Sequence, residues 1–589
     1  NIDFYNSYII KKLSKKVKNK KRAANKHPGL IMLEIDGLAK EILDEAIEKG
    51  YMPTLKRWIE NKTHTLKEWE TDLSSQTGAS QAGILHGNNK DIIAYRWVEK
   101  ENNNKIIVSS NFSHAPLIEQ KISDGNGLLS DKGASRANMF SGDSDDFIFT
   151  SSKIIELNKL YNKTWYSVFT TSNSFQRIFV LFLWDILKEL KSQIVHKIKN
   201  IQPRMKRGIV YATLRAGGNV FLREVVTETL AGDILNGEIN SAYATYVGYD
   251  EVAHHSGIRD NDVWSVLKEI DLEINRLENA ESISKRPYEF VILSDHGQGN
   301  GATFKQRYGI TLGNFVRRFL PEDMKSLRTD EESDHFRNSY IPKNESIENI
   351  REKMDNIKNH DIFEEYESLQ NIKEKSIDFL KIDELYKSEQ IQTLRKKYSD
   401  SLDYIRGYEA SQHTTKKASD SELIVLGSGN LGLIYLTQWK HRLTYEEIIS
   451  LFPDLIPGLV KHPGIGFILV NSLANGGMVI GKNGIYYLES DEIIGENPLA
   501  DFGKNAPKHL KRHNTFKNMP DILVNSFYDP ESGDICAFEE LIGSHGGLGG
   551  TQTKPFILYP SDWDCPDELV GAKSIYDLLK NGMKKLKEE

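Results

Sequence analysis

Several short apolar runs in the chain end directly in polar residues. Leu30 to Ile35 is the first such run, and Asp36-Gly37 ends it. Continuous apolar runs of this length are typical of strands that are buried on both faces of a parallel sheet. The next stretch, Leu38 to Gly50, has apolar residues at helical spacing and ends in glycine, which predicts an amphipathic helix. Together they predict a β-loop-α unit with an aspartate at the carboxyl end of its strand. Asp36 is then either part of a site at this sheet edge or only the N-cap of the helix.

The same pattern recurs twice. Ala242 to Gly248 leads to Asp250 and His254, which are four residues apart and would share one face of a helical turn. Tyr288 to Leu293 leads to Asp295-His296-Gly297. Neighbours on a strand point to opposite faces, so this aspartate and histidine can share a site only if the backbone turns there, which a glycine permits. Alternating strands and helices with polar residues at strand ends predict an α/β sandwich, with a mainly parallel central sheet flanked by helices.

Other runs extend this predicted core. Strand-like stretches occur at residues 63–70, 92–99, 105–110, 422–426, 431–436, 465–470 and 555–559. Met52 to Asn61 is a predicted helix, and Asn483-Gly484 predicts a hairpin turn. We read the strands after residue 420 as the same core resuming. Asp124 to Asp146 is rich in Gly, Ser and Asp, and we read it as a solvated loop because its spacing matches no calcium-binding loop.

Three regions stand apart from the core, which we take to be one domain over residues 29–589. Residues 1–28 form a basic arm with nine Lys or Arg between Lys11 and Lys26; it is either a solvated arm or a segment facing anionic lipid. Residues 151–235 read as a helical cap, in which Phe175 to Ile201 either packs on the protein's own core, the default, or lies at an interface. Residues 320–420 read as a charged helical insertion with a solvated face.

Composition narrows the function classes. The net charge of −7 over 589 residues makes general nucleic-acid binding an unfavoured function. Two cysteines, Cys536 and Cys565, provide neither a disulfide framework nor a cysteine metal site. We expect no transmembrane helix, because no apolar run reaches about 18 residues. The chain begins at Asn1 without a methionine, which predicts a processed form.

Thr77 begins the run of small residues Gly78-Ala79-Ser80-Gln81-Ala82-Gly83. Small residues let a backbone approach a ligand, and the free N–H groups of a helix N-terminus suit an anion. A threonine hydroxyl needs a base or a metal to become a nucleophile. The alternative is that Thr77 is a helix N-cap, a common role of threonine. Carboxylates and imidazoles elsewhere in the chain are suitable ligands for Zn²⁺ or Mn²⁺, namely Asp36, Asp250, His254, Asp295, His296 and His545.

Taken in order, these residues resemble the alkaline phosphatase superfamily, and within it the type I phosphodiesterase/nucleotide pyrophosphatase branch. The resemblance covers residues 29–315 and 420–565. It is carried by IDG at 35–37, Thr77 with Gly87 ten residues on, D-x3-H at 250–254, DHG at 295–297 and SHGG at 544–547.

The resemblance implies a metal-dependent phosphoric ester hydrolase that acts through a threonine nucleophile and two divalent metal ions, Zn²⁺ before Mn²⁺. It implies that Asp250, His254 and His545 hold one ion. It implies that Asp36, Asp295, His296 and the oxygen of Thr77 hold the other. The implied partner is a phosphate-ester small molecule, or the head group of a lipid or polymer.

The chain departs from the family after the nucleophile, where Gly78-Ala79-Ser80 replaces the usual Pro-Asn pair. The substrate-binding candidates are therefore Asn88, Asn89, Arg96 and Asn138. The run from Ser74 to Glu101 is also similar to bacterial membrane-linked phosphodiesterase-like proteins with an N-terminal hydrophobic region. That resemblance implies membrane association, on the extracytoplasmic side rather than the cytoplasmic one, although a basic juxtamembrane arm would favour the cytoplasm.

Two other functions stay open: a phosphoglycerol or phosphoethanolamine transferase acting on envelope lipids or polymers, and a non-catalytic surface protein that keeps the fold. The transferases use one metal ion, so the full set of two-metal ligands in this chain disfavours them. A non-catalytic protein would be expected to have lost at least one ligand, and every ligand is present in the sequence. A sulfatase is disfavoured because no Cys or Ser in a C/S-x-P-x-R context lies around Thr77.

Overall fold

The computed structural model describes residues 27–153, 172–205, 207–321, 327–330 and 422–588. Its central sheet has seven strands in the order β2-β19-β8-β1-β7-β5-β6. Five adjacent strands, from β8 to β6, run parallel, whereas β19 is antiparallel to both β8 and β2. The strands span β1 Gly29–Ile35, β2 His64–Glu68, β5 Gly133–Arg136, β6 Asp146–Ile148, β7 Ser241–Tyr246, β8 Tyr288–Leu293 and β19 Phe556–Pro560.

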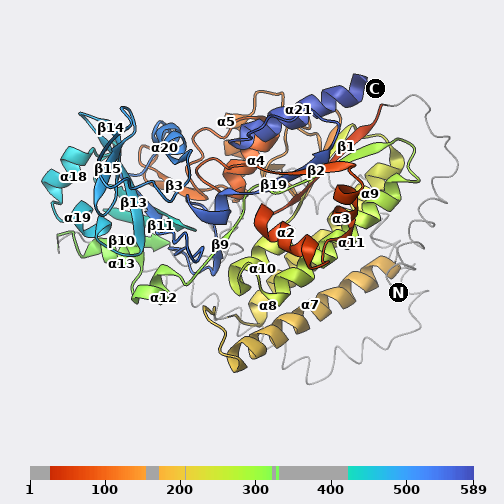
Figure 1. Ribbon diagram of the computed structural model, residues 1–589, viewed down its shortest axis with the longest axis horizontal. Coiled ribbons are helices and arrows are strands. Elements are labelled where there is room, and N and C mark those ends of the chain that lie inside the picture. The colour runs from red at the N-terminus through yellow and green to blue at the C-terminus, as the bar shows by residue number, and fades with distance from the viewer. Residues whose placement is uncertain (1–26, 154–171, 206, 322–326, 331–421, 589) are drawn as a thin grey trace, which may run out of the picture. The chain divides into compact units, whose positions relative to one another are not determined.

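Helices cover both faces of this sheet (Figure 1). One face packs in a single hydrophobic core against α2 (Lys40–Glu48), α3 (Pro53–Glu60), α9 (Arg223–Asn236), α10 (Gly248–Ser256) and α11 (Asn261–Glu281). Helices α4 (Thr77–His86) and α21 (Ala572–Glu588) pack against each other, and α21 also contacts β1. β1 is buried along its whole length, as its mostly apolar run predicts, and this includes its one charged residue, Glu34. The predicted α/β sandwich with a mainly parallel sheet is confirmed.

The Gly-, Ser- and Asp-rich stretch from 124 to 146 is not the predicted solvated loop. It contains β5, which is buried throughout and pairs with β7. Arg136 on β5 is paired with Asp233 and Asp146 at 2.8 and 3.0 Å. The prediction was wrong because β5 has only four residues, Gly-Ala-Ser-Arg, and Ala134 is its only apolar side chain. A strand of this composition shows no hydrophobic periodicity.

The strands between residues 422 and 526 join β10 in a second sheet instead of extending the first, whereas the strand predicted at 555–559 is β19 of the central sheet. The second sheet has the order β10-β11-β12-β17-β13-β14-β15-β16, and its pairs are antiparallel except β10 with β11. The predicted hairpin at Asn483-Gly484 is confirmed between β14 and β15. The strands span β10 Leu327–Asp330, β11 Leu423–Ser428, β12 Leu431–Leu436, β13 Ile465–Ser472, β14 Gly476–Ile480, β15 Gly484–Tyr487, β16 Glu492–Gly495 and β17 Ile522–Ser526.

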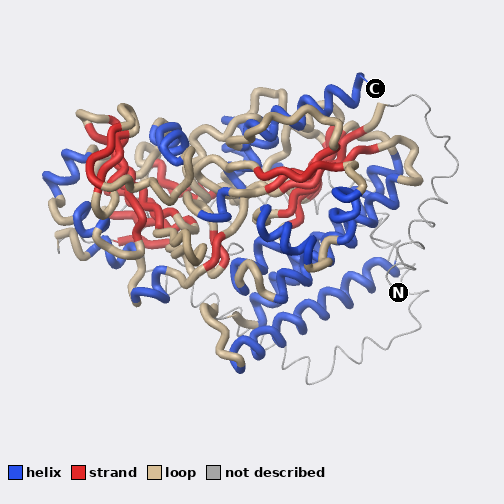
Figure 2. Tube along the Cα trace, viewed as in Figure 1, coloured by secondary structure: helices blue, strands red, loops and turns tan. Residues whose placement is uncertain are grey.

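The second sheet has its own hydrophobic core with short helices (Figure 2). These are α12 (Phe304–Tyr308), α13 (Leu312–Arg317), α18 (Tyr445–Leu451) and α19 (Leu455–Val460). Two small ribbons complete the strands: β3 (Arg96–Glu99) with β4 (Lys105–Val108), and β9 (Gly299–Asn300) with β18 (Gly543–Ser544). The remaining helices are α5 (Ala115–Ile122), α20 (Ala506–Asn514) and the 3₁₀ turn η5 (Gly550–Thr553).

The three outlying regions are only partly described. The basic arm falls outside the described residues up to position 26. The described part of the predicted cap is helical, with α7 (Ser172–Ile198), α8 (Ile209–Ala216) and the π-helical turn η2 (Gly217–Leu222) ahead of α9. Most of the charged insertion lies outside the described residues, and its described part contains the strand β10, where helix was expected. In the part of the chain that the structure describes, no helix is both long and apolar enough to cross a bilayer.

A buried ion-pair cluster at the end of α4 makes stability depend on pH. His86 Nε2 lies 2.9 Å from Glu119 Oε1, and its Nδ1 lies 3.7 Å from Asp143 Oδ2. Burial alone would lower the pKa of His86, but the two carboxylates raise it to about 9. Since the pKa is higher in the folded state, this stabilisation is complete below the unfolded value of about 6.5 and is lost as the pH rises through about 9.

We therefore predict that wild type is more stable than His86→Gln by on the order of 3 kcal/mol at pH 6, and that this difference shrinks towards zero between pH 6.5 and 10. Urea unfolding of both proteins across this range measures it. Taking the difference at each pH removes the other groups that titrate there. A difference that stays constant with pH would contradict the assignment.

Candidate active site

Three neighbouring parallel strands deliver the predicted carboxylates to one edge of the central sheet. β1 lies between β8 and β7, and Glu34 on β1 is in register with Leu293 on β8. Asp36 follows β1 directly, Asp295 lies two residues after β8, and Asp250 lies on α10 just after β7. Because parallel strands end at the same edge, residues more than 200 positions apart in sequence become neighbours.

Thr77 is the first residue of α4 and faces this edge. Its Oγ1 lies 3.1 Å from His296 Nε2 and 3.4 Å from Asp36 Oδ1. The N-cap is Gln76, in extended conformation, so Thr77 does not have the capping role that was its alternative assignment. A Cβ on Gly78 would stand 2.7 Å from Ser109 Oγ, so the small residue there is needed for close packing. The first N–H groups of α4 have no acceptor within the helix. Such N–H groups form a favourable binding site for an anion next to Thr77.

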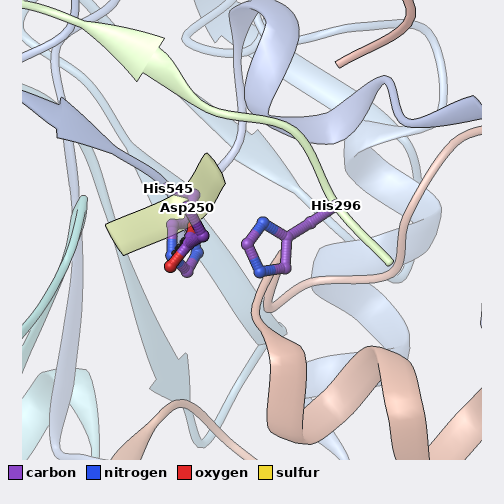
Figure 3. A group of neighbouring side chains, drawn as sticks. All are labelled: Asp250, His296 and His545. Atoms are coloured by element: carbon purple, nitrogen blue, oxygen red, sulfur yellow. Dashed lines mark ion pairs between the residues drawn. The ribbon is translucent and has the colours of Figure 1, made fainter. Parts of the chain in front are cut away.

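The structure brings together all seven predicted site residues. Two groups have ligand atoms within 4.8 Å of one another: Asp36 with Asp295 and His296, and Asp250 with His296 and His545. Figure 3 shows His296 beside Asp250 and His545. His254 joins through Asp250, whose Oδ2 is 3.0 Å from His254 Nε2. Where the resemblance implies that His296 belongs to one group, the geometry places it within reach of both.

The three imidazoles are oriented in the same way. The Nδ1 atoms of His254, His296 and His545 lie 2.6, 3.0 and 2.8 Å from the backbone carbonyl oxygens of Gly543, Gly297 and Ser75. A carbonyl only accepts hydrogen bonds, so each Nδ1 carries the proton. In a neutral ring the Nε2 lone pair then points at the carboxylates, an arrangement of acceptors facing acceptors. A cation between them resolves this conflict, as in metal sites whose histidines are held through their second nitrogen.

The carboxylates carry more negative charge than the protein offsets. Burial and the charges of Asp295 and Asp250 raise the pKa of Asp36 well above its ordinary value. Burial raises the pKa of Asp295 to about 7. The hydrogen bond from the N–H of Gly37 lowers this pKa, and the negative charge of Asp250 raises it further. Asp295 Oδ2 also has no hydrogen-bond donor among the described residues. Divalent cations would favour the ionised forms, so the donor set fits a metal centre.

Asp250 and His254 behave as a charged pair. Burial opposes ionisation of Asp250, but the neighbouring His254 holds the pKa of this carboxyl well below its ordinary value. Burial likewise opposes protonation of His254, yet Asp250 raises its pKa to about 9. Without a metal, His254 would therefore be protonated at neutral pH, and a metal ligand must lose that proton.

A second layer of side chains fixes the ligands, and only a folded chain shows it. Gln298 donates from Nε2 to Asp250, and Ser294 Oγ accepts from the N–H of Leu38 at 3.0 Å. Ser75 Oγ donates to the carbonyl of Gly547 and accepts from the N–H of Gly546, the two residues that directly follow His545. Gln298 stands directly after the DHG motif and Ser75 directly before the Thr77 segment, which was the only sequence signal available for them.

The four predicted substrate-binding residues bond to protein groups. Asn88 and Asn89 lie beyond the far end of α4, about 15 Å from Thr77 along the helix axis. Arg96 is buried and paired with Glu539. Asn138 donates to Ser135 Oγ and to the carbonyl of Tyr243. These contacts hold the loops around α4, and a substrate role for the four stays a prediction.

The sequence of residues 30–446 matches the family model of type I phosphodiesterase/nucleotide pyrophosphatase. The chain belongs to this family. It is therefore a phosphoric ester hydrolase, as the resemblance in the sequence implied, and members of the family are metal-dependent. No curated protein matches the chain.

Several solved structures align with nearly the whole chain at low sequence identity. Phosphonoacetate hydrolase from Sinorhizobium meliloti 1021, in complex with phosphonoformate, has 11% identity and a TM-score of 0.42, covering 94% of this chain and 96% of that chain. Murine ectonucleotide pyrophosphatase/phosphodiesterase 5 has 10% identity and a TM-score of 0.40, covering 94% and 95%. Its human counterpart has 11% identity and a TM-score of 0.43, with the same coverage.

A close backbone contact joins the second sheet's first hairpin to the loop of His545, a predicted metal ligand. Gly429, between β11 and β12, has φ +59°, and a Cβ there would stand 1.7 Å from the carbonyl oxygen of His545. The same carbonyl accepts from the N–H of Asn430 at 3.0 Å. No side chain larger than hydrogen fits at position 429 without moving the His545 loop.

We predict that Gly429→Ala lowers hydrolysis of a phosphodiester by at least roughly tenfold, because a displacement of about 1 Å at a catalytic group has effects of this size or larger. Gly309→Ala is the matched control, since Gly309 has φ +69° and nothing within 4 Å of an added Cβ. Both substitutions carry the same backbone cost of about 1 kcal/mol. Steady-state kinetics and thermal melts of the two proteins decide, and equal activity in both would contradict the role of the contact.

Proposed function

We propose that this protein hydrolyses phosphodiesters, as phosphodiesterase/nucleotide pyrophosphatase enzymes do, with Thr77 as the nucleophile and two divalent cations at the site. The observation that carries the proposal is the position of Thr77 Oγ1, at the N-terminus of α4 and within 3.4 Å of both Asp36 and His296. A hydroxyl that served only the helix would bond to the backbone of its own first turn.

Seven side chains supply the ligands. Asp36, Asp295, His296 and Thr77 would hold one ion, and Asp250, His254 and His545 the other, with His296 close enough to contribute to either. Mixed imidazole and carboxylate donors suit Zn²⁺, with Mn²⁺ as the alternative. When bound, two such cations lower the pKa of a nearby hydroxyl and offset charge on the attacking and leaving oxygens of a displacement.

The chain's own residues position the reaction. The hydroxyl of Thr77 donates towards Asp36 Oδ1, which leaves a lone pair of Oγ1 to attack phosphorus. The free N–H groups of α4 face the phosphoryl oxygens and stabilise their charge. Oγ1 gives its proton to Asp36 and forms the new bond to phosphorus while the bond to the opposite ester oxygen breaks; that oxygen takes a proton from solvent and leaves as an alcohol. Water then attacks phosphorus and loses a proton to solvent, the bond between phosphorus and Oγ1 breaks, and Oγ1 regains its proton from Asp36, which releases a phosphomonoester.

The acceptor of the second step separates hydrolysis from transfer. A phosphoglycerol or phosphoethanolamine transferase would pass the phosphoryl group to an acceptor alcohol instead of water. Product analysis in the presence of glycerol distinguishes the two, because a transferase yields the glycerol ester. A non-catalytic protein would form neither product with any divalent metal.

For the metals, we predict that His254→Gln binds about one ion fewer per chain than wild type, because one imidazole ligand is lost. His255→Gln is the control: His255 is the adjacent residue, it is equally buried, and its Nδ1 faces the carbonyl of Glu251. Elemental analysis after dialysis gives the stoichiometry. Chelation should also lower the melting temperature of wild type more than that of His254→Gln. Equal metal content in the two variants would remove His254 from the ligand set.

For the nucleophile, we predict that Thr77→Ala lowers turnover of bis-p-nitrophenyl phosphate by roughly three orders of magnitude or more, with the fold and metal content near normal. Thr77→Ser keeps a hydroxyl and should retain much of the activity. Because Thr77 is not the N-cap, the alanine variant should lose less than about 1 kcal/mol of stability. A metal-loaded Thr77→Ala protein that turns over at the wild-type rate would rule out this nucleophile.

A further inference from the structure

Helix α7 has its polar residues inside and its apolar residues outside. Its two acids, Asp185 and Glu189, and its histidine, His196, are all buried. Glu189 is paired with Arg207 at 3.2 Å and also with Arg215. His196 Nε2 lies 3.0 Å from Asp260 Oδ2. These partners fix the rotation of the helix about its axis, because turning it would strip buried charges of their counter-charges.

The outward side of α7 is apolar. Six side chains form what we call the outer stripe, with exposed fractions of 45% to 78%: Val180, Leu183, Trp184, Leu187, Ile194 and Ile198. Their spacing of three, four and seven residues places them along one side of the helix. The helix does pack on the protein itself, as the sequence-based default has it, but it does so through its polar side, and the apolar side chains of the stripe stay exposed. Soluble monomers rarely expose a continuous apolar surface of this length, so the stripe indicates a binding surface.

The exposed charges around the outer stripe are all positive within α7 and the residue that follows it. Lys191 lies within the stripe, and Lys197 and Lys199 flank its end. Both acids of the helix point inward, so none of its exposed side chains is negative. An apolar face with Trp and Leu, bordered by lysines, is the pattern of helices that lie in the plane of a lipid interface. Each lysine adds attraction to anionic head groups.

A second copy of this chain fits the stripe less well. A two-fold interface places the same patch on both sides, so Lys191 would approach its own counterpart with no acid of α7 nearby. An anionic lipid surface complements the lysines and takes up the apolar side chains. We propose that the outer stripe of α7 docks this protein on an anionic lipid surface, with the helix lying parallel to it.

Docking there would orient the candidate active site. α7 packs on α8 and η2, and η2 packs on α10, the helix that carries Asp250 and His254 (Figure 1). Arg207, between α7 and α8, donates to Ser256 Oγ at the end of α10 at 2.7 Å. The surface thus connects to the site through one layer of helices. The proposal goes beyond the proposed function, since vesicle binding does not depend on hydrolysis.

The test is co-sedimentation of the 589-residue chain with vesicles of equimolar phosphatidylglycerol and phosphatidylcholine, and with phosphatidylcholine alone. We expect wild type to pellet with the anionic vesicles, less so at high salt. Leu187→Glu should lower the partition coefficient by about tenfold or more, through lost apolar burial and added negative charge. Leu473→Glu is the matched control, an equally simple change at an exposed leucine after β13, and should bind as wild type does.

A second readout locates the contact. Trp184 should contribute a blue shift of fluorescence on vesicle addition, and Trp184→Phe should lose that shift while still pelleting. The proposal is overturned if wild type does not pellet with anionic vesicles. It is also overturned if Leu187→Glu binds like wild type, which would assign binding to the basic arm. A lower melting temperature of Leu187→Glu, or a wild-type dimer that this variant splits, would instead assign the stripe to a contact within or between chains.

Discussion

The structure depends on holding buried negative charge at one edge of a parallel sheet. Asp36, Asp250 and Asp295 meet there because β1, β7 and β8 are neighbours that run in the same direction. Water cannot reach these carboxylates freely, and the pKa values of Asp36 and Asp295 are accordingly raised. A cluster of this kind is costly for folding unless cations or protons offset it. The surrounding architecture therefore serves to place imidazoles and hydrogen-bond donors around it.

The second sheet contributes the support that the central sheet lacks. Its hairpin at Gly429 touches the backbone of His545, and the small ribbon of β9 and β18 ties the residues before His545 to those after Asp295. The imidazoles of His296 and His545 stack with ring centroids 3.8 Å apart. The predicted ligand His545, near the end of the chain, is thus fixed by strands of a separate core. Integrity of the second core is a condition for the chemistry of the first.

Buried polar pairing recurs in α7 with a different consequence. At the candidate active site, inward-facing carboxylates form the donor set that we propose binds cations. In α7, the buried Asp185 and Glu189 turn the polar side of the helix inward, so its apolar side is exposed. The two features are connected through α10, whose far end is bonded to Arg207. Charge pairing in the interior of the protein therefore decides which side of α7 is left exposed.

The sequence by itself determined the parts whose signal is local. Mostly apolar runs predicted β1, β7 and β8, and the polar residues that follow them are the predicted metal ligands, because a strand's carboxyl end fixes where the next residues lie. Asp250 and His254 needed only the helical repeat to be placed on one face. The order of the motifs from Asp36 to His545 indicated the family. The small residues after Thr77 indicated a helix that begins there.

Only the tertiary structure decided what depends on partners distant in sequence. Strands 422–526 read like those of the central sheet, because local periodicity does not specify which sheet a strand joins. Ser75 and Gln298 look like ordinary polar residues until Gly546 and Asp250 lie beside them. The outer stripe of α7 reads as a core-facing surface, since amphipathicity fixes that a helix has two sides but not which one faces in. Arg207, Arg215 and Asp260 settle that choice by pairing with its polar side, and none of the three is adjacent to it in sequence.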